Sequence, residues 1–286
     1  MDAVLGPGRR GVIRLSDVPR EELQHPLAEA GLPSATPVEL GVGVPGPDAP
    51  GPAAPGPGDR QGLAGYVAVA CRRPSLVLDR DTWIVAAADG HMARGGDPAA
   101  LALAACDRPP PRRVAVFGGA WIREEEPVYG SIRSLGRWLA EGGVHVVCGG
   151  YQGAMAAACR GVREGGGTAV GVTISVWQDL VEVNRWLTHE LIARDLFARL
   201  PLITDADAWV AFPGGVGTLH EVALCWNLVQ TYLAGPRPLV LVGEAWDRQM
   251  RLFRDLLRVS DPAHFDLVRP AATLDDVLEA IAPSLR

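Results

Sequence analysis

The chain has 286 residues and a formal net charge of −6 at pH 7, and 48% of its residues are hydrophobic. This length fits one large domain plus a smaller one, with enough apolar residues for a sizeable core. The negative charge argues against nonspecific binding of a nucleic acid polymer, which needs a basic face. No apolar run is long enough for a signal peptide or a bilayer span, so we expect a cytoplasmic protein without a membrane partner.

Five cysteines are spread over the chain, and none lies at the spacing of a zinc site or of a CxxC motif. We therefore expect reduced and mostly buried thiols, and we predict no metal and no other cofactor. The five are Cys71, Cys106, Cys148, Cys159 and Cys225.

Residues 1–110 are predicted to form an N-terminal extension, to which the sequence assigns no chemistry. Residues 43–60 are rich in Pro, Gly and Ala and lack a hydrophobic period, which predicts a linker. A second break, DRPPPRR, lies at 107–113. The predicted elements are a strand at 11–15, a helix at 16–31, strands at 65–72 and 76–89 joined by a turn at Arg73–Pro74, and a helix at 97–105.

Residues 111–286 alternate short apolar runs with amphipathic segments, a pattern typical of parallel strands joined by helices. The predicted fold class is therefore α/β, a Rossmann-like doubly wound parallel sheet with a small N-terminal α+β extension. Such sheets bind ligands at the carboxyl ends of their strands, near a switch in strand order. The predicted strands are 114–119, 144–150, 168–174, 208–215 and 238–244, and the predicted helical segments are 127–143, 153–167, 190–203, 218–235, 246–259 and 274–285.

The strongest local signal is PGGVGTLHE, from Pro213 to Glu221, which follows a predicted strand and opens a predicted helix. Its glycines let the backbone turn tightly and approach a ligand, and the amides at a helix start favour an anion. Thr218 can donate its hydroxyl to a phosphate, and Glu221 lies about one helical turn further on. A simpler interpretation stays open, in which Thr218 and Glu221 form a T-x-x-E capping box at an ordinary turn.

The motif PGGVGTLHE fits PGGxGTxxE of the LOG family, and the resemblance runs from about residue 112 to the C-terminus. VFGGAW at 116–121 is similar to the family's first-strand turn, and VVCGGYQGAMAAA at 146–158 is similar to its second glycine motif. Arg199 matches the arginine that the family carries before its fourth strand, whereas Arg194 is the weaker match. The sequence departs from the family at Ala120, where a phosphate-binding serine is common.

The resemblance implies hydrolysis of the N-glycosidic bond of a nucleoside 5'-monophosphate to a free base and ribose 5-phosphate, by a homodimer. Glu221 would stabilise the positive charge that builds on the ribose or activate water, and Arg199 would orient the nucleotide or stabilise the departing group. The substrate would lie against Gly118, Gly119, Gly149, Gly150, Gly153, Met155, Gly214, Gly215, Gly217 and Thr218.

Two other functions are compatible with a LOG-like fold. A non-catalytic carrier of a nucleotide or of a phosphate-bearing cofactor would need the glycines but not the pair of Arg199 and Glu221. Lysine decarboxylase, an old name for the family, would need a lysine for pyridoxal phosphate, and the chain contains none. On general grounds Arg199 would otherwise be a solvated or salt-bridged helix residue, and Met155 a core residue.

Overall fold

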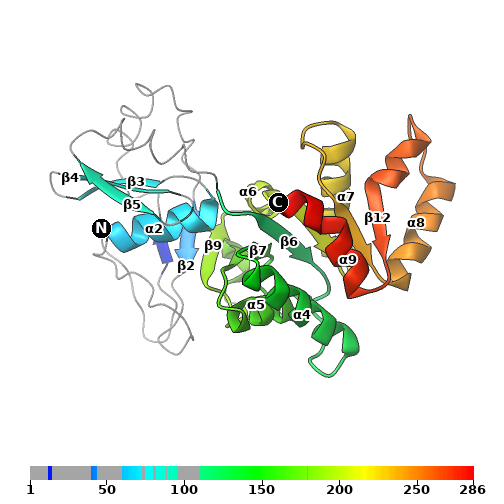
Figure 1. The fold of residues 1–286 in the computed structure, drawn as a ribbon, viewed down its shortest axis with the longest axis horizontal. Helices are drawn as coiled ribbons and strands as arrows, with labels where there is room; N and C mark the ends of the chain where they lie inside the picture. The colour runs from blue at the N-terminus through cyan, green and yellow to red at the C-terminus, as the bar shows by residue number, and fades with distance from the viewer. Residues whose placement is uncertain are drawn as a thin grey trace. The chain divides into compact units, whose positions relative to one another are not determined.

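A computed structural model describes residues 12–14, 40–43, 60–72, 75–79, 82–87, 89, 91–95, 110–178 and 180–286 (Figure 1). The chain divides into two compact units. The first comprises residues 1–111, 172–180 and 188–199, and the second comprises residues 112–171, 181–187 and 200–286. Two late segments therefore group with the N-terminal part. The predicted domain boundary at residue 110 stays a prediction.

The first unit contains three antiparallel strands and a separate small sheet. Strand β2 (Leu40–Gly43) pairs with β1 (Val12–Arg14) on one side and with β9 (His189–Ala193) on the other. The small sheet has the order β3 (Ser75–Asp79), β4 (Thr82–Ala86) and β5 (Met92–Gly95), and all its pairs are antiparallel. The predicted strand at 11–15 is confirmed by β1, whereas 76–89 forms two strands rather than one.

The predicted strand at 65–72 is wrong, because these residues belong to helix α2 (Arg60–Cys71). Ala64 and Ala68, four residues apart, are fully buried and form a small apolar cluster with Ala86 of β4. Alanine is the best helix former, and its small side chain allows close packing of the helix on the sheet. The predictions for 16–31, 73–74 and 97–105, and for nearly all of the linker 43–60, lie outside the described residues.

The second unit is built on a parallel sheet in the order β8-β7-β6-β10-β11-β12 (Figure 1). Every pair in this order is parallel. All five strands predicted for the main domain are present, and the α/β, Rossmann-like fold class is confirmed. The strands are β6 (Arg113–Phe117), β7 (His145–Cys148), β8 (Ala169–Ile174, of which the first three residues lie in this unit), β10 (Ala208–Ala211), β11 (Leu239–Val242) and β12 (Val268–Ala271).

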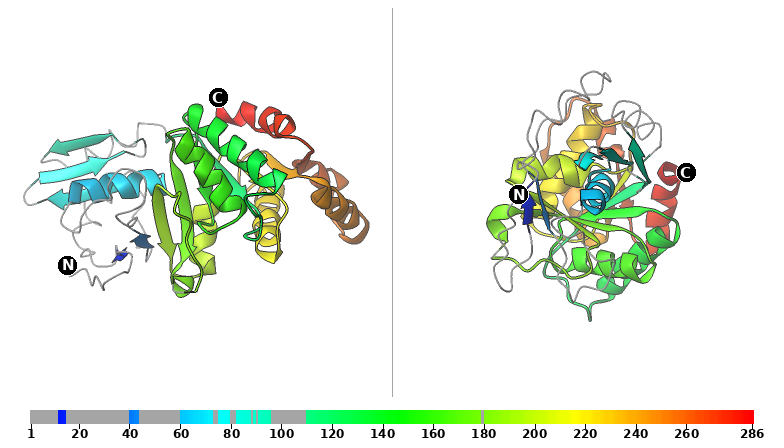
Figure 2. Two further views of the ribbon diagram at one scale, coloured as in Figure 1. Left: turned by 90° about the horizontal axis from the view of Figure 1, so that it is seen from below. Right: turned by 90° about the vertical axis from the view of Figure 1, so that its left-hand side faces the viewer.

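Helices cover both faces of this sheet (Figure 2, left). Helices α4, α5 and α9 pack on one face, where they enclose the main apolar core with side chains such as Val116 and Val210. Helix α7 covers the other face. The helices are α4 (Pro127–Glu141), α5 (Ala154–Glu164), α6 (Leu196–Thr204), α7 (Val216–Gln230), α8 (Glu244–Leu256) and α9 (Leu274–Ile281), with 3-10 turns at Ser175–Trp177, Pro262–Leu267 and Ala282–Leu285.

Two elements differ from the sequence prediction in this part of the chain. The segment 190–203 was predicted as one helix, but it begins with strand β9, and α6 starts only at Leu196. Four consecutive residues of β9 are buried, so a helical period in this apolar stretch was misleading. Strand β12 was not predicted, because its exposed centre, Arg269–Pro270, lacks an apolar pattern.

Helices α4 and α5 cross so closely that their backbones touch. A Cβ on Gly136 of α4 would collide with the carbonyl of Ala158, and one on Gly161 of α5 would collide with the carbonyl of Arg133. These two glycines let the helices approach within backbone contact. The pair therefore forms a rigid layer on one face of the sheet.

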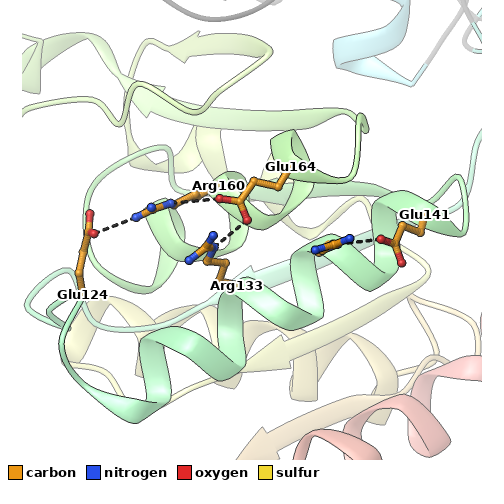
Figure 3. A network of polar contacts seen from close by, with 6 residues as sticks. Glu124, Arg133, Glu141, Arg160 and Glu164 are labelled. Carbon is orange, nitrogen blue, oxygen red and sulfur yellow. Dashed lines mark hydrogen bonds and ion pairs between the residues drawn. The ribbon is translucent and has the colours of Figure 1, made fainter.

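Charged side chains join the solvent side of the same helix pair (Figure 3). Arg133 of α4 contacts Glu164 of α5 at 2.7 Å, and Arg160 contacts Glu164 at 3.3 Å. Arg160 also reaches Glu124, in the loop between β6 and α4, at 2.8 Å. Its guanidinium stacks over the ring of Trp186 at 5.3 Å. Arg160 thus ties the loop after β6 to helix α5.

None of the helices in the described ranges combines the length and the apolar character that a membrane crossing requires.

Candidate functional site

The parallel sheet of the second unit has a switch in strand order between β6 and β10. From β6 the chain moves to β7 and β8 on one side, and later returns to β10 on the other side of β6. The loops that leave these two central strands are therefore the expected ligand site. They are joined to each other, because the amide of Gly119 donates to the carbonyl of Pro213 at 2.9 Å.

The loop after β10 opens helix α7. Gly215 is the N-cap of this helix, and no side chain caps it in the part of the chain that the structure describes. Thr218 lies inside the first turn, so the capping-box interpretation, with Thr218 as the cap, is wrong. Gly215 and Gly217 are exposed, and a Cβ on either would meet nothing within 4 Å. The first turn of α7 therefore presents bare backbone to open space, where its amides and dipole favour an anion.

Gly214 has a different reason to be glycine. A Cβ at this position would collide with the Oγ1 of Thr218, whose side chain folds back over the glycine. Thr218 is itself buried, with 5% of its surface exposed. The tight turn therefore keeps the hydroxyl of Thr218 close to the motif's own backbone.

Packing also explains the glycines of the loop after β6 and of the turn before α5. A Cβ on Gly118 would lie 2.6 Å from the Cβ of Ala154, and one on Gly153 would collide with the carbonyl of Gly119. Gly153 also has a positive φ of 67°, which a residue with a side chain rarely adopts. The amide of Ala154 donates to the carbonyl of Gly119 at 3.0 Å. These glycines bring two loops into contact, so a ligand is not needed to account for them.

The turn after β7 is held by a residue that the sequence did not single out. The amide of Asn184 donates to the carbonyl of Gly150, and its Nδ2 donates to the carbonyl of Tyr151 at 3.0 Å. Gly149 and Gly150 are buried, and Gly150 has a positive φ of 81°. Asn184 thus fixes this glycine turn. It lies in no recognisable motif, and no signal in one sequence could have identified it.

Met155, which the resemblance places near the base, lies in the apolar core between the sheet and its helices. This position agrees with the simpler interpretation of the residue as a packing side chain. Cys148, Cys159 and Cys225 are buried free thiols, as expected for the cysteines that the structure describes.

Glu221 lies one turn into α7 and is buried, with 8% of its surface exposed. Burial raises the pKa of the neighbouring Cys225 thiol, and the negative charge of Glu221 raises it further. A glutamate so close to the bare first turn could act on a group bound there. His220, beside it, is exposed.

Arg199 belongs to the first unit, where it lies within a buried polar group. It has 6% of its surface exposed, and its Nε donates to the carbonyl of Val172 at 2.7 Å. The next residue, Thr173, donates its hydroxyl to the buried carboxylate of Glu190 at 2.8 Å. Arg199 is therefore buried rather than solvated, and the alternative of a salt-bridged helix residue stays open. Arg194, the weaker match to the family arginine, is exposed and paired with Asp195.

The second unit therefore brings together Gly214–Thr218, Glu221 and the loop Gly118–Trp121, whereas Arg199 lies in the first unit. Such an arrangement suits a phosphate on backbone amides with a carboxylate one turn away. Within the described ranges, no three His, Cys, Asp or Glu side chains group as metal ligands would.

Comparisons with known proteins agree with the motifs. The model of the SLOG cluster4 family matches residues 111–234. A cytokinin riboside 5'-monophosphate phosphoribohydrolase of Rhodococcoides fascians is 33% identical over 134 residues, which are 45% of this chain and 67% of that protein. One of Mycobacterium tuberculosis is 32% identical over 146 residues, 48% of this chain and 75% of that protein.

Among solved structures, the molybdenum cofactor binding protein of Rippkaea orientalis superimposes with a TM-score of 0.50 at 21% identity. The match covers 62% of this chain and 98% of that one, and it shows a shared fold. The sequence relatives carry the family assignment, because they are more than 30% identical and the match covers two thirds or more of their length. The chain belongs to the LOG family.

Proposed function

We propose that this protein hydrolyses a nucleoside 5'-monophosphate to a free base and ribose 5-phosphate. The observation that carries the proposal is the start of α7, where exposed Gly215 and Gly217 precede a buried glutamate. No side chain caps this helix in the described part of the chain, so its first amides can receive a phosphate. The names of the family relatives support the same reaction class.

In this mechanism the phosphate binds to the first turn of α7, with the hydroxyl of Thr218 beside it. The dipole of α7 and its amides hold the anion and so fix the ribose. Cleavage of the N-glycosidic bond builds positive charge on the ribose, as in glycoside hydrolysis. The carboxylate of Glu221 stabilises that charge or takes a proton from the attacking water. Its low exposure strengthens this interaction, because little water screens it.

Arg199 is assigned to the nucleotide in this proposal. Its guanidinium carries five donors, of which Nε already binds the carbonyl of Val172. This bond orients the side chain within the first unit. The support is the family match together with the burial of the side chain.

The test is incubation with a panel of nucleoside 5'-monophosphates, with free base and ribose 5-phosphate measured by chromatography. We expect release from at least one of them, and release that falls by roughly a hundredfold or more in Glu221→Gln, a loss typical of one electrostatic group. Glu279→Gln, on the exposed side of α9, is the matched control and should keep wild-type turnover. Tight binding without release from any nucleotide would instead favour a carrier.

A further inference from the structure

The loop after β6, at the switch in strand order, carries a large aromatic side chain that is exposed to solvent. Trp121 follows β6 by four residues and exposes 60% of its surface. Helix α7 begins on the adjoining loop, which is joined to this one by the bond from Gly119 to Pro213. An exposed indole offers a flat apolar surface for contact, and here its loop adjoins the loop that opens α7.

The indole lies against the backbone of Gly119. A Cβ on Gly119 would lie 2.7 Å from both Cε2 and Nε1 of Trp121, and 3.1 Å from Cζ2. Glycine at 119 therefore gives the ring room to lie against the loop. The loop is itself fixed at both polar atoms of Gly119, whose amide donates to Pro213 and whose carbonyl accepts from Ala154. A large part of the ring is not covered by this loop and stays exposed to solvent.

We propose that Trp121 is the stacking platform for the base of the bound nucleotide. The inference rests on the proposed function and adds to it the group that recognises the base. Bases stack well on indole rings because both are flat and polarisable. Stacking tolerates different bases, so this platform favours a nucleobase as a class and does not select one by hydrogen bonds.

The experiment compares binding of adenosine 5'-monophosphate with binding of ribose 5-phosphate, which lacks the base, by calorimetry. A Glu221→Gln background prevents consumption of the nucleotide. Trp121→Ala should weaken the nucleotide by roughly tenfold and leave ribose 5-phosphate within twofold, whereas Trp121→Phe should retain most of the nucleotide affinity. Trp138→Ala, an exposed tryptophan on α4, is the matched control and should change neither affinity.

A second readout is independent of stability. Stacking should quench part of the fluorescence of the eight tryptophans, and this part should be absent from Trp121→Phe. Equal nucleotide affinity in Trp121→Ala, or equal loss for both ligands, overturns the platform. Binding without turnover in the wild type overturns only the proposed reaction, because no turnover enters this measurement. Failure of the wild type to bind the nucleotide overturns both.

Discussion

Replacement of Gly217 by alanine should stabilise the protein and weaken its ligand. Gly217 is the second residue of α7, its φ lies outside the left-handed region, and a Cβ there meets nothing within 4 Å. Alanine restricts the unfolded chain at such a site and adds about 0.4–1 kcal/mol of stability. For a protein of this size that corresponds to a rise in Tm of about 1–4 °C.

The same methyl group would occupy the space from which a phosphate reaches the first amides of α7. Displacing the phosphate from one charge-assisted hydrogen bond costs about 1.5–3 kcal/mol, or roughly tenfold or more in affinity. Gly217→Ala should therefore raise Tm and weaken both adenosine 5'-monophosphate and ribose 5-phosphate. A glycine needed for folding alone would show the opposite sign in Tm.

Gly130 provides the control for this experiment. It lies in the first turn of α4, it is exposed, and a Cβ there also meets nothing within 4 Å. Gly130→Ala should raise Tm by a similar amount and leave both affinities unchanged. Tm is measured by calorimetry and affinity by titration. Unchanged affinity in Gly217→Ala would refute the idea that the open face of α7 receives the phosphate.

Three further outcomes follow from the structure. Gly161→Ala should lower the free energy of unfolding by about 1–3 kcal/mol, and Tm with it, because its methyl group meets a backbone carbonyl of α4 and overpacks the core. The hydrogen bond from the backbone amide of Thr273 holds the pKa of Asp276 below its usual range. The stability that this bond contributes is present at neutral pH and is lost as the pH falls through the lowered pKa. The Tm deficit of Asp276→Asn should therefore shrink in acid. Arg199→Lys should reduce turnover roughly tenfold or more by loss of a charged hydrogen bond, whereas turnover of the exposed control Arg194→Lys should be unchanged.

The parallel strands of the second unit were predictable because each is a short apolar run that ends in a turn residue. β6, β8, β10 and β11 are buried along their whole length, and β7 is buried in all but its first residue, so their sequences carry little polar interruption. The N-terminal part was harder to predict. In α2 the alternation of alanine with larger residues suggested a strand, and only the packing of Ala64 and Ala68 on Ala86 reveals a helix. Burial against a partner overrode the local pattern.

The candidate site was predictable as a location and less so in its details. The motif PGGVGTLHE predicts the strand-to-helix turn, and Glu221 lies one turn into α7, as expected. Trp121 and Asn184 have no counterpart in the sequence argument, because their roles depend on contacts with Gly119 and Gly150. The joint action of Arg199 and Glu221, the homodimer and the compartment stay predictions.

The glycines of this protein illustrate why a motif cannot by itself define a binding surface. Gly118 and Gly153 are required by neighbouring atoms, whereas Gly215 and Gly217 have open space where a side chain would go. The sequence alone does not distinguish these two kinds of glycine. Packing glycines are needed for folding, so their substitution should damage stability first. Open glycines leave the backbone within reach of a ligand, but Gly130 of α4 shows that open space alone does not define a site. The phosphate site is sought at α7 because its open glycines lie on the loop after β10, at the switch in strand order.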